Sequence, residues 1–474
     1  MSDPTTLPLL QSSDLVNVGG FTVPNTDANG SFNYGGDVMA FSSGSLLLGN
    51  GYKVAQISIP APLVSGSVKA LPRASYVKPF ASVLGSGRGD GVGPAKADKI
   101  GGLLVLPDRV IASAYVYYDA NNTQLRSHAR LNPDLTDRSS PRVWSQVWQA
   151  KKAGFVAGPM THIPPEWQAL LGGSALTGLS CIPIVTRTSF GPSAFAFDPL
   201  QVGQPTVPAQ PLVYYPSDHP TLGPWSGSNP TYGATTLIGG MVIVPGTRTL
   251  LFFGSNGVGE HIYGYGTSDK TLHGKPHPQG EKWAYDPTDS AKGSHAYPYK
   301  YQVWAYDLSD CAAVKAGTKQ PWEVKPYGVW PIDLPINHAF QVRFASVAID
   351  PVSRRIYAAQ YKGESTATGD GQPIVWAFDP KVSTPVPVPP PPPPPPPPLP
   401  PPSEVETLKA EVAALQIQLA AERATIVVMH QQLADAEARG DATAVALAAM
   451  RAERDAALKR HADLLAALKA LLAQ

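Results

Sequence analysis

The sequence has little charge, little cysteine and no long apolar run. Only 15% of its residues are charged and the formal net charge is +1, so no overall attraction to nucleic acid or to an anionic membrane is expected. Its 2 cysteines, Cys181 and Cys311, are far apart in the chain, and buried free thiols are the simplest expectation. No window approaches the roughly 18 apolar residues that a membrane-spanning helix needs.

Several sequence motifs are also missing. The first residues carry no basic segment followed by an apolar core, so we expect no signal peptide and synthesis in the cytoplasm. A protein of this kind would reach the cell exterior by lysis or on a particle; the alternative is that it stays cytoplasmic. The sequence contains no P-loop, no dinucleotide-binding fingerprint and no nucleophile elbow, and we predict no cofactor.

Proline divides the chain. Residues 385–402 are nearly all proline, with an unbroken run from Pro389 to Pro398. Proline fixes φ and has no amide donor, so this segment predicts a polyproline II rod about 55 Å long. A docking segment for a proline-binding domain is the alternative interpretation. We therefore predict two folded regions, residues 1–384 and 403–474, separated by a linker over 385–402.

A short repeat predicts the fold of the first region. Small residues followed by an apolar strand recur at Tyr34, Ile100, Leu176, Ile238 and Phe344. Further apolar strands and turn residues follow each copy, as in the four-stranded antiparallel blades of a propeller. We expect an all-β fold with five blades, or six if the long fourth unit contains another. The predicted blades are residues 34–84, 98–158, 172–216, 235–334 and 341–380, with residues 15–24 closing the last one.

Two segments depart from plain blades. Residues 163–173 predict a short helix, with prolines in the first turn and glycine at the end. Residues 253–299 form a long insertion rich in histidine and acidic residues. Their spacing matches no compact metal site, so a solvated loop is favoured over a metal site. Residues 25–31 imitate half of a calcium loop, but Gly36 stands where the bidentate Glu belongs, which favours a polar turn. No metal site is predicted.

A hydrolytic activity is the enzymatic alternative. Propeller glycosidases use two carboxylates that flank one sugar bond. The only acid at the axial end of a predicted inner strand is Asp37; the equivalent positions are Leu103, Leu179, Met241 and Val347. Glu166 is the other candidate, but the sequence does not bring it near Asp37. We predict no catalytic residues and no enzymatic activity.

Exposed aromatic residues are the stronger indication of a ligand surface. Tyrosine and tryptophan offer an apolar face and a polar tip, which suits contacts with sugars and proteins. Most propeller aromatics pack between blades, so we select only residues expected in loops or on outer strands. The predicted ligand-binding residues are Trp225, Tyr232, Tyr263, Tyr265 and Trp283.

The last region contains no proline and follows one heptad frame. Ser403 and Glu406 form a capping box that would start the helix. The frame passes unchanged through Gly440, which favours one continuous helix, about 100 Å long, over a hairpin restarted at Asp441. A homo-oligomeric coiled coil is expected; the heptad pattern leaves a dimer and a trimer open, and the overall architecture favours the trimer. The predicted oligomerisation residues are Val405, Leu408, Val412, Leu415, Leu419, Ile426, Met429, Leu433, Leu447, Met450, Leu464, Leu468 and Leu471.

Three motifs carry a resemblance to known proteins. The segments at 163–173, 188–199 and 301–307, with the glycine-strand repeats, resemble a group of propeller proteins found in bacteria and tailed phages. The resemblance covers about Leu15 to Pro380. It implies the propeller fold, and because the group has no established activity, it assigns no functional residues.

The predicted order of parts is a globular head, a stiff spacer and an oligomeric stalk. This order is typical of a fibre or spike, so we expect a non-enzymatic virion component of a tailed phage. We expect it to bind a host-surface glycan or protein, and its partners within the particle would be other virion proteins. The alternatives are a carbohydrate-active enzyme with an oligomerising tail, and an intracellular protein-binding scaffold.

Overall fold

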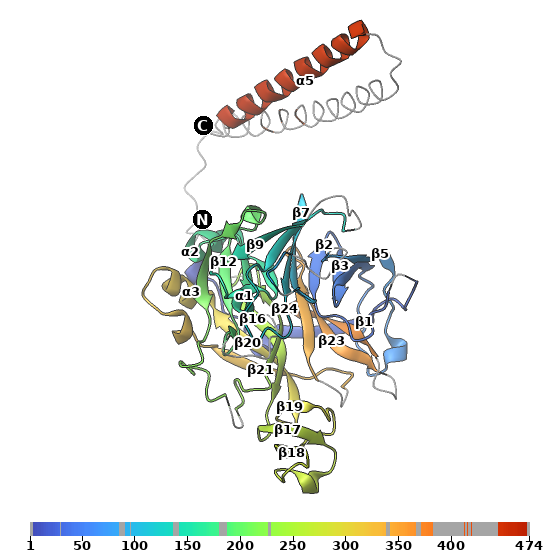
Figure 1. Ribbon diagram of the computed structural model, residues 1–474, viewed down its shortest axis with the longest axis vertical. Coiled ribbons are helices and arrows are strands. Elements are labelled where there is room, and N and C mark those ends of the chain that lie inside the picture. The colour runs from blue at the N-terminus through green and yellow to red at the C-terminus, as the bar shows by residue number, and fades with distance from the viewer. Residues whose placement is uncertain are drawn as a thin grey trace, which may run out of the picture. The chain divides into compact units, whose positions relative to one another are not determined.

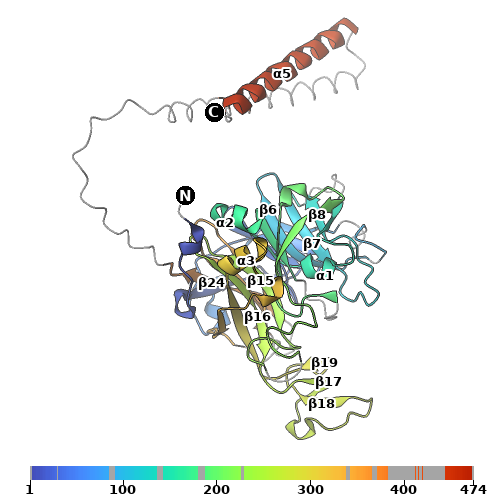
Figure 2. The ribbon, with the colours of Figure 1, turned by 90° about the vertical axis from the view of Figure 1, so that its left-hand side faces the viewer.

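A computed structural model describes most of the chain (Figures 1 and 2). It covers residues 3–28, 30–84, 91–94, 96–135, 142–179, 187–225, 229–337, 342–365, 371–382 and 444–471, together with Val412, Leu415 and Leu419. The chain divides into two compact units, Met1–Thr384 and Pro385–Gln474. The predicted polyproline linker lies outside the described residues.

The first unit is built almost entirely of small antiparallel sheets, which confirms the expected all-β class. Four of the larger sheets follow the chain in order, except that one short strand joins the second sheet from between two strands of the third. The fifth sheet combines three late strands with the first one. The strands of the five sheets are β2 (Met39–Ser42), β3 (Ser45–Asn50), β4 (Lys53–Ser58) and β5 (Tyr76–Ser82); β6 (Lys99–Leu106), β7 (Arg109–Tyr115), β8 (His128–Leu131) and β9 (Val143–Val147), with β13 (Thr206–Val207); β10 (Met160–His162), β11 (Ala175–Gly178), β12 (Ala194–Phe197) and β14 (Ala209–Val213); β15 (Leu237–Ile243), β16 (Thr249–Gly257), β20 (Tyr299–Asp307) and β21 (Gly328–Ile332); and β22 (Phe344–Ile349), β23 (Ile356–Ser365), β24 (Gly371–Pro380) and β1 (Leu15–Thr22).

The five sheets pack face to face in a cyclic order. The first strands contact one another in the order β2, β6, β10, β15, β22, and β22 contacts β2 again. A separate hydrophobic core fills each of the five spaces between neighbouring sheets. Both faces of each sheet are therefore buried, which explains the near-continuous apolar strands in the sequence.

The N-terminal strand completes the last sheet. β1 runs antiparallel to β24, with Leu15 opposite Pro380 and Thr22 opposite Ile374. This pairing confirms the prediction that residues 15–24 add the fourth strand there. Phe21 of β1 is fully buried in the core between this sheet and the β2–β5 sheet, so the two ends of the unit share one sheet and one core.

The predicted limits of the third unit were wrong. Its first strand is β10, before the short helix, and the repeat at Leu176 belongs to the second strand, β11. The repeat pattern failed here because only three residues of β10 are paired, too few to show alternation. Leu179 is consequently not on an inner strand.

The described helices are few. α1 (Ala153–Val156) and α3 (Leu308–Lys315) lie in the first unit, and α5 (Ala444–Leu471) lies in the second. The helix predicted over 163–173 is confirmed as α2 (Pro165–Leu171), and Gly172 ends it in the left-handed conformation at φ 85°. None of these helices combines the length and the apolar character needed to cross a membrane.

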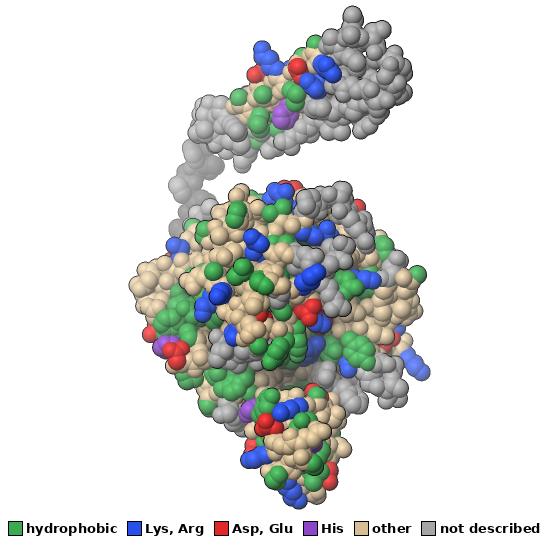
Figure 3. All heavy atoms as spheres, viewed as in Figure 1, with side chains coloured by type: hydrophobic (Ala, Val, Ile, Leu, Met, Phe, Trp, Pro, Cys, Tyr) green, Lys and Arg blue, Asp and Glu red, His purple; other side chains and the backbone are tan. Residues whose placement is uncertain are grey.

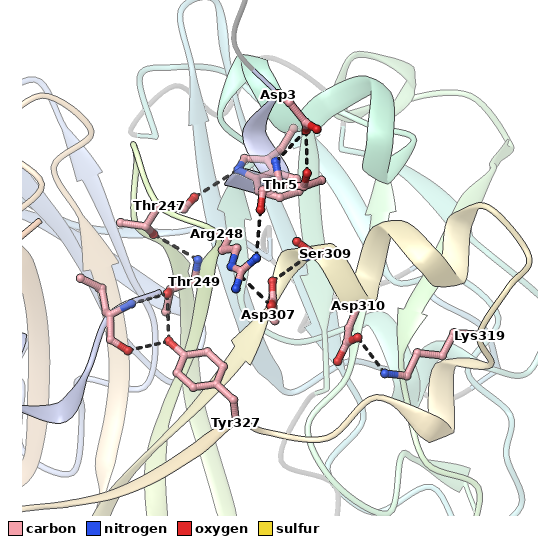
Figure 4. Close-up of polar contacts among 12 residues, drawn as sticks. Asp3, Thr5, Thr247, Arg248, Thr249, Asp307, Ser309, Asp310, Lys319 and Tyr327 are labelled. Carbon is pink, nitrogen blue, oxygen red and sulfur yellow. Dashed lines mark hydrogen bonds and ion pairs between the residues drawn. The ribbon is translucent and has the colours of Figure 1, made fainter. Parts of the chain in front are cut away.

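Polar contacts attach the N-terminal segment to the fourth sheet (Figure 4). Three groups form a closed cycle: the Leu10 amide donates to Thr249 Oγ1 (3.0 Å), Thr249 bonds Tyr327 Oη (2.9 Å), and Tyr327 donates to the Leu10 carbonyl (2.9 Å). Arg248 also donates to the Thr5 carbonyl at 2.9 Å. Burial raises the pKa of Tyr327 to about 12, so its hydroxyl keeps the proton that it donates.

We expect Tyr327→Phe to release the N-terminal segment. The substitution leaves the Leu10 carbonyl and the Thr249 hydroxyl without this partner, which should cost about 1–3 kcal/mol. Urea unfolding of the full chain should show the loss, and limited proteolysis should accelerate within residues 3–14. Tyr118→Phe is the control, because Tyr118 is 71% exposed; equal effects of the two substitutions would contradict this role for Tyr327.

Candidate binding surface

The insertion predicted as a solvated loop is a folded module. Residues 258–298 contain a three-stranded sheet of β17 (Ile262–Thr267), β18 (Lys282–Tyr285) and β19 (Lys292–His295), plus a short helical turn at Lys270–Leu272. The long strands β16 and β20 carry it, and they remain paired up to Gly257 and Tyr299. In both ribbon views the module projects from the rest of the unit (Figures 1 and 2).

Alternating glycine and tyrosine give the module two different faces. On one face of β17, the backbone of Lys282 lies against Gly264 and the backbone of Asp289 lies against Gly266. A side chain at either glycine would collide with this backbone. Tyr263 and Tyr265 point to the opposite side. The backbone packing on one face therefore leaves the aromatic side chains on the other.

The tyrosine side carries a compact group of rings. Tyr265 lies between Trp283 on β18 and Lys292 on β19 in the strand register. The His277 imidazole stacks on Tyr265 at 3.8 Å between ring centroids, and it meets Trp283 edge-on at 4.2 Å. Tyr263 is 54% exposed. We refer to Tyr263, Tyr265, His277 and Trp283 as the aromatic face.

Polar groups border the aromatic face. Lys292 Nζ lies 5.9 Å from the Tyr263 ring centroid and 5.8 Å from that of Tyr265, within the range of a cation–π contact. It also pairs with Glu281 at 3.3 Å. Both ionic side chains are exposed, so the face combines flat apolar rings with hydrogen-bonding groups. Figure 3 shows apolar, basic and acidic side chains mixed on the surface of the module.

A buried ion pair supports the module from its other side. His295 Nδ1 lies 2.8 Å from Asp286 Oδ2, and His295 Nε2 donates to the Ala291 carbonyl at 2.9 Å. Asp286 also accepts from Tyr299 Oη at 2.6 Å and from Thr288. Although burial disfavours the charged forms, these hydrogen bonds raise the pKa of His295 and lower that of Asp286. Since both His295 nitrogens are engaged, this pair stabilises the module and has no free nitrogen for acid–base catalysis.

A small cavity lies at the edge of the sheets where the first strands begin. Its volume is about 50 Å³, and Asp37, Tyr115 and Arg343 contribute to its lining together with backbone at Gly101 and Gly239. Burial raises the pKa of Asp37, although Arg343 and Lys99 oppose this shift. The module emerges at the same edge, because the start of β15 pairs with the end of β16.

The two candidate carboxylates for hydrolysis lie at opposite edges. Asp37 lines the cavity before β2, whereas Glu166 follows β10 on α2. The next residue, Trp167, donates to the carbonyl of Thr247 in the turn between β15 and β16, at the far end of the first strands. Carboxylates that flank one sugar bond are about 5–10 Å apart, and this pair does not share a site.

The predicted aromatic residues separate into two groups. Tyr263, Tyr265 and Trp283 come together in the aromatic face, but Trp225 and Tyr232 lie elsewhere, beside Phe190. The expectation of an exposed Tyr232 was wrong, because this side chain is only 4% exposed and packs in the core between the third and fourth sheets. Trp225 is half-buried against the same core.

Sequence reasoning selected the rings of the module but not their partners. His277, Glu281 and Lys292 come from three separate positions of the insertion, and only strand pairing brings them together. The repeated Gly-Tyr pattern of residues 263–266 could have indicated a two-faced strand.

Among the described residues, no three His, Cys, Asp or Glu side chains are grouped to hold a metal ion. In the segment that imitates half of a calcium loop, residues 25–31, the Asp27 carboxylate accepts a hydrogen bond from the Gly30 amide at 3.1 Å, which closes the predicted polar turn.

Comparisons with known proteins assign no family. No family model matches the sequence, and no curated protein matches it. One similar solved structure is that of a luciferin-regenerating enzyme, with 7% identity and a TM-score of 0.32 over 78% of this chain and 95% of that chain. A likeness this low establishes neither a common fold nor a common activity.

The buried pair predicts a pH window for the stability of the module. Asp286, with its lowered pKa, stabilises above its ordinary value of 3.8, and this contribution is lost as pH falls through the lowered pKa. His295, with its raised pKa, stabilises below its ordinary value of 6.5, and this contribution is lost as pH rises through the raised pKa. Hydrogen exchange of residues 262–295, corrected for intrinsic rates, should be slowest between these values.

His295→Gln provides the control for this prediction. Glutamine retains a donor but cannot titrate, so the loss of protection on the alkaline side should disappear. His261, whose pKa is lowered by burial and by His295, remains in the variant. If the His295→Gln variant still loses protection from hydrogen exchange as the pH rises, the pH dependence belongs to a group other than His295.

Proposed function

We propose that residues 15–380 form a closed five-bladed β-propeller. Three observations support this proposal: the cyclic contacts of the five first strands, one core between each pair of neighbouring sheets, and the antiparallel pairing of β1 with β24. In this arrangement the five large sheets are the blades. The insertion module then extends from the ends of the two middle strands of the fourth blade, β16 and β20.

We further propose that the protein binds glycans and is not an enzyme. The observation that carries this proposal is the aromatic face with Lys292 and Glu281 beside it. A pyranose ring has one apolar side for stacking on an aromatic ring and hydroxyl groups for hydrogen bonds to charged side chains. A flat, projecting surface of this kind suits binding better than hydrolysis, which needs paired carboxylates around an enclosed sugar bond.

The order of the parts along the chain supports the view that glycan binding attaches the protein to a host surface. A proline-rich spacer and a heptad-patterned tail follow the β unit in the sequence. Linking several weak sugar sites raises the effective affinity without new contacts. Together with the sequence resemblance, this favours a fibre-like appendage of a tailed phage. Its presence on purified particles, detected by mass spectrometry, is the direct test of that location.

The tail carries one covered stripe. Among the described side chains of α5, the less exposed ones are Arg454, Ala457, His461, Leu464 and Leu465. The first four follow the alternating spacing of three and four of the predicted frame. Ala457 is fully buried in a single chain. Helix pairing within one tail is therefore a second candidate beside self-association. Leu419 is also buried and Val412 and Leu415 are partly so; the other predicted oligomerisation positions before 444, and the chain at Gly440, lie outside the described residues.

We expect Trp283→Ala to weaken glycan binding. The substitution removes one ring of the aromatic face and the edge contact with His277, which should cost about 1 kcal/mol, or roughly fivefold in affinity. A glycan array identifies the best ligand of the full chain, and calorimetry with that ligand measures the change.

Trp322→Ala is the matched control for this experiment. Trp322 also contacts a histidine ring, that of His219 at 5.0 Å between centroids, but it lies in the turn before β21, outside the module. It should leave the affinity unchanged. If both tryptophan variants bind as the original chain does, the aromatic face is not the glycan site.

Light scattering on the full chain and on a chain stopped at Thr384 tests the tail. We expect a trimer, or else a dimer, for the full chain and a monomer for the shorter one, because the heptad stripe is the proposed contact. Monomers in both cases would assign the buried stripe to pairing within one tail and would remove the support for a multivalent fibre.

A further inference from the structure

A positively charged cluster lies beside the small cavity that contains Asp37. The Arg343 guanidinium carbon is 3.8 Å from the centroid of the Tyr361 ring, and Lys362 Nζ is 4.6 Å from that of Tyr34. Lys99 acts electrostatically on Asp37 from the start of β6. We refer to Arg343, Lys362 and Lys99 as the basic cluster.

The acidic groups present do not balance the basic cluster. Among the described residues, Asp37 is the only carboxylate in the cavity lining, and its contact with Arg343 is long, at 3.4 Å. Asp289 of the module attracts Lys362 electrostatically. Arg343 and Lys362 lie against the same ring, with the guanidinium carbon 3.8 Å and Lys362 Nζ 5.5 Å from the Tyr361 centroid. Burial and the charge of Arg343 accordingly lower the pKa of Lys362. An additional anion would relieve this repulsion.

One donor in the cluster also lacks an acceptor. Arg343 Nε is buried and has no hydrogen-bond partner among the described residues. A buried, unsatisfied guanidinium donor is costly, and a carboxylate is the acceptor that fits its geometry best. Asp37 reaches Arg343 only through Nη2, at 3.4 Å, and so leaves Nε without an acceptor.

We propose that this cavity binds the carboxylate of an acidic sugar, with Arg343 as the main contact and Lys362 and Lys99 as supporting charges. The inference rests on the proposed glycan binding and adds a substrate class, polysaccharides that contain carboxylate-bearing sugars. The cavity of about 50 Å³ holds a carboxylate and little more. The sugar ring therefore remains outside, where Tyr34 is 48% exposed.

The position of the cavity agrees with this extension of the glycan surface. The cavity and the module share one edge of the sheets, and Asp289 of the module is near enough to Lys362 to affect its pKa. A polysaccharide chain could contact the aromatic face with one residue and the basic cluster with another. The formal net charge of +1 makes non-specific attraction of an anionic polymer weak.

Binding of polygalacturonate and of its carboxyl-reduced, neutral form to the full chain tests the proposal. Arg343→Gln should weaken binding of the acidic polymer about tenfold and leave binding of the neutral polymer unchanged. Arg355→Gln is the matched control, since Arg355 also pairs with an aspartate, Asp379, at 2.6 Å on the same sheet but at its opposite edge. Thermal unfolding of each variant checks that it is folded.

Asp37→Asn distinguishes a ligand site from a structural ion pair. Removing the competing carboxylate should tighten binding of the acidic polymer about threefold, a gain that a folding defect cannot produce. If Asp37→Asn weakens binding as much as Arg343→Gln does, the two residues act as a structural pair and the proposal is wrong.

The outcomes also separate this proposal from the proposed function. If the original chain binds both polymers equally, glycan binding stands and the carboxylate site is refuted. If Arg343→Gln acts as expected but Trp283→Ala has no effect, the carboxylate site stands and the role of the aromatic face falls. Binding of neither polymer overturns both. Equally tight, Arg343-dependent binding of poly-glutamate would replace the acidic sugar with an acidic polypeptide.

Discussion

The pairing of β1 with β24 is the interaction on which the β unit depends. It places the first strand of the unit in its last sheet, from Leu15 opposite Pro380 to Thr22 opposite Ile374. Without β1, the edge of β24 would expose unpaired amide and carbonyl groups, and the core around Phe21 would lose one wall. The contacts of Leu10 with Thr249 and Tyr327 hold the chain that leads into this strand. The ends of the unit are thereby coupled, although they are far apart in the sequence.

Strand direction then decides where the functional groups lie. Each first strand begins at the same edge, so Asp37, Gly101, Gly239 and Arg343 meet there although they belong to different sheets. The antiparallel partner of β15 ends at that edge, and the module grows from it. The aromatic face and the basic cluster therefore belong to one end of the unit. The opposite edge carries α2 and the turn at Thr247.

The sequence predicted the parts of the fold that depend on local pattern. Apolar strands, turn residues and prolines indicated the all-β class, the position of α2 and the pairing of residues 15–24. It failed where a feature is short or depends on tertiary packing. The three-residue β10 gives no alternation, so the third unit was displaced. Tyr232 looked exposed because the sequence does not show that its loop folds onto Phe190.

The candidate binding surface shows the same division. The sequence predicted Tyr263, Tyr265 and Trp283 as ligand-binding residues, and the structure brings these three together on one sheet. It did not predict the sheet itself, since the insertion's strands are short and pair partly in parallel. Arg343 and Lys362 were missed because their relation to Asp37 and to Tyr34 is entirely three-dimensional.

Hydrogen–deuterium exchange of the full chain, with and without the best glycan from an array, tests the central claim most directly. The account predicts that the ligand slows exchange within residues 262–295, with added protection around Arg343 for an acidic glycan. Peptides at the opposite edge, such as those covering α2, should not change. Protection confined to the α2 edge, or to the region around Trp225 and Tyr232, would contradict it.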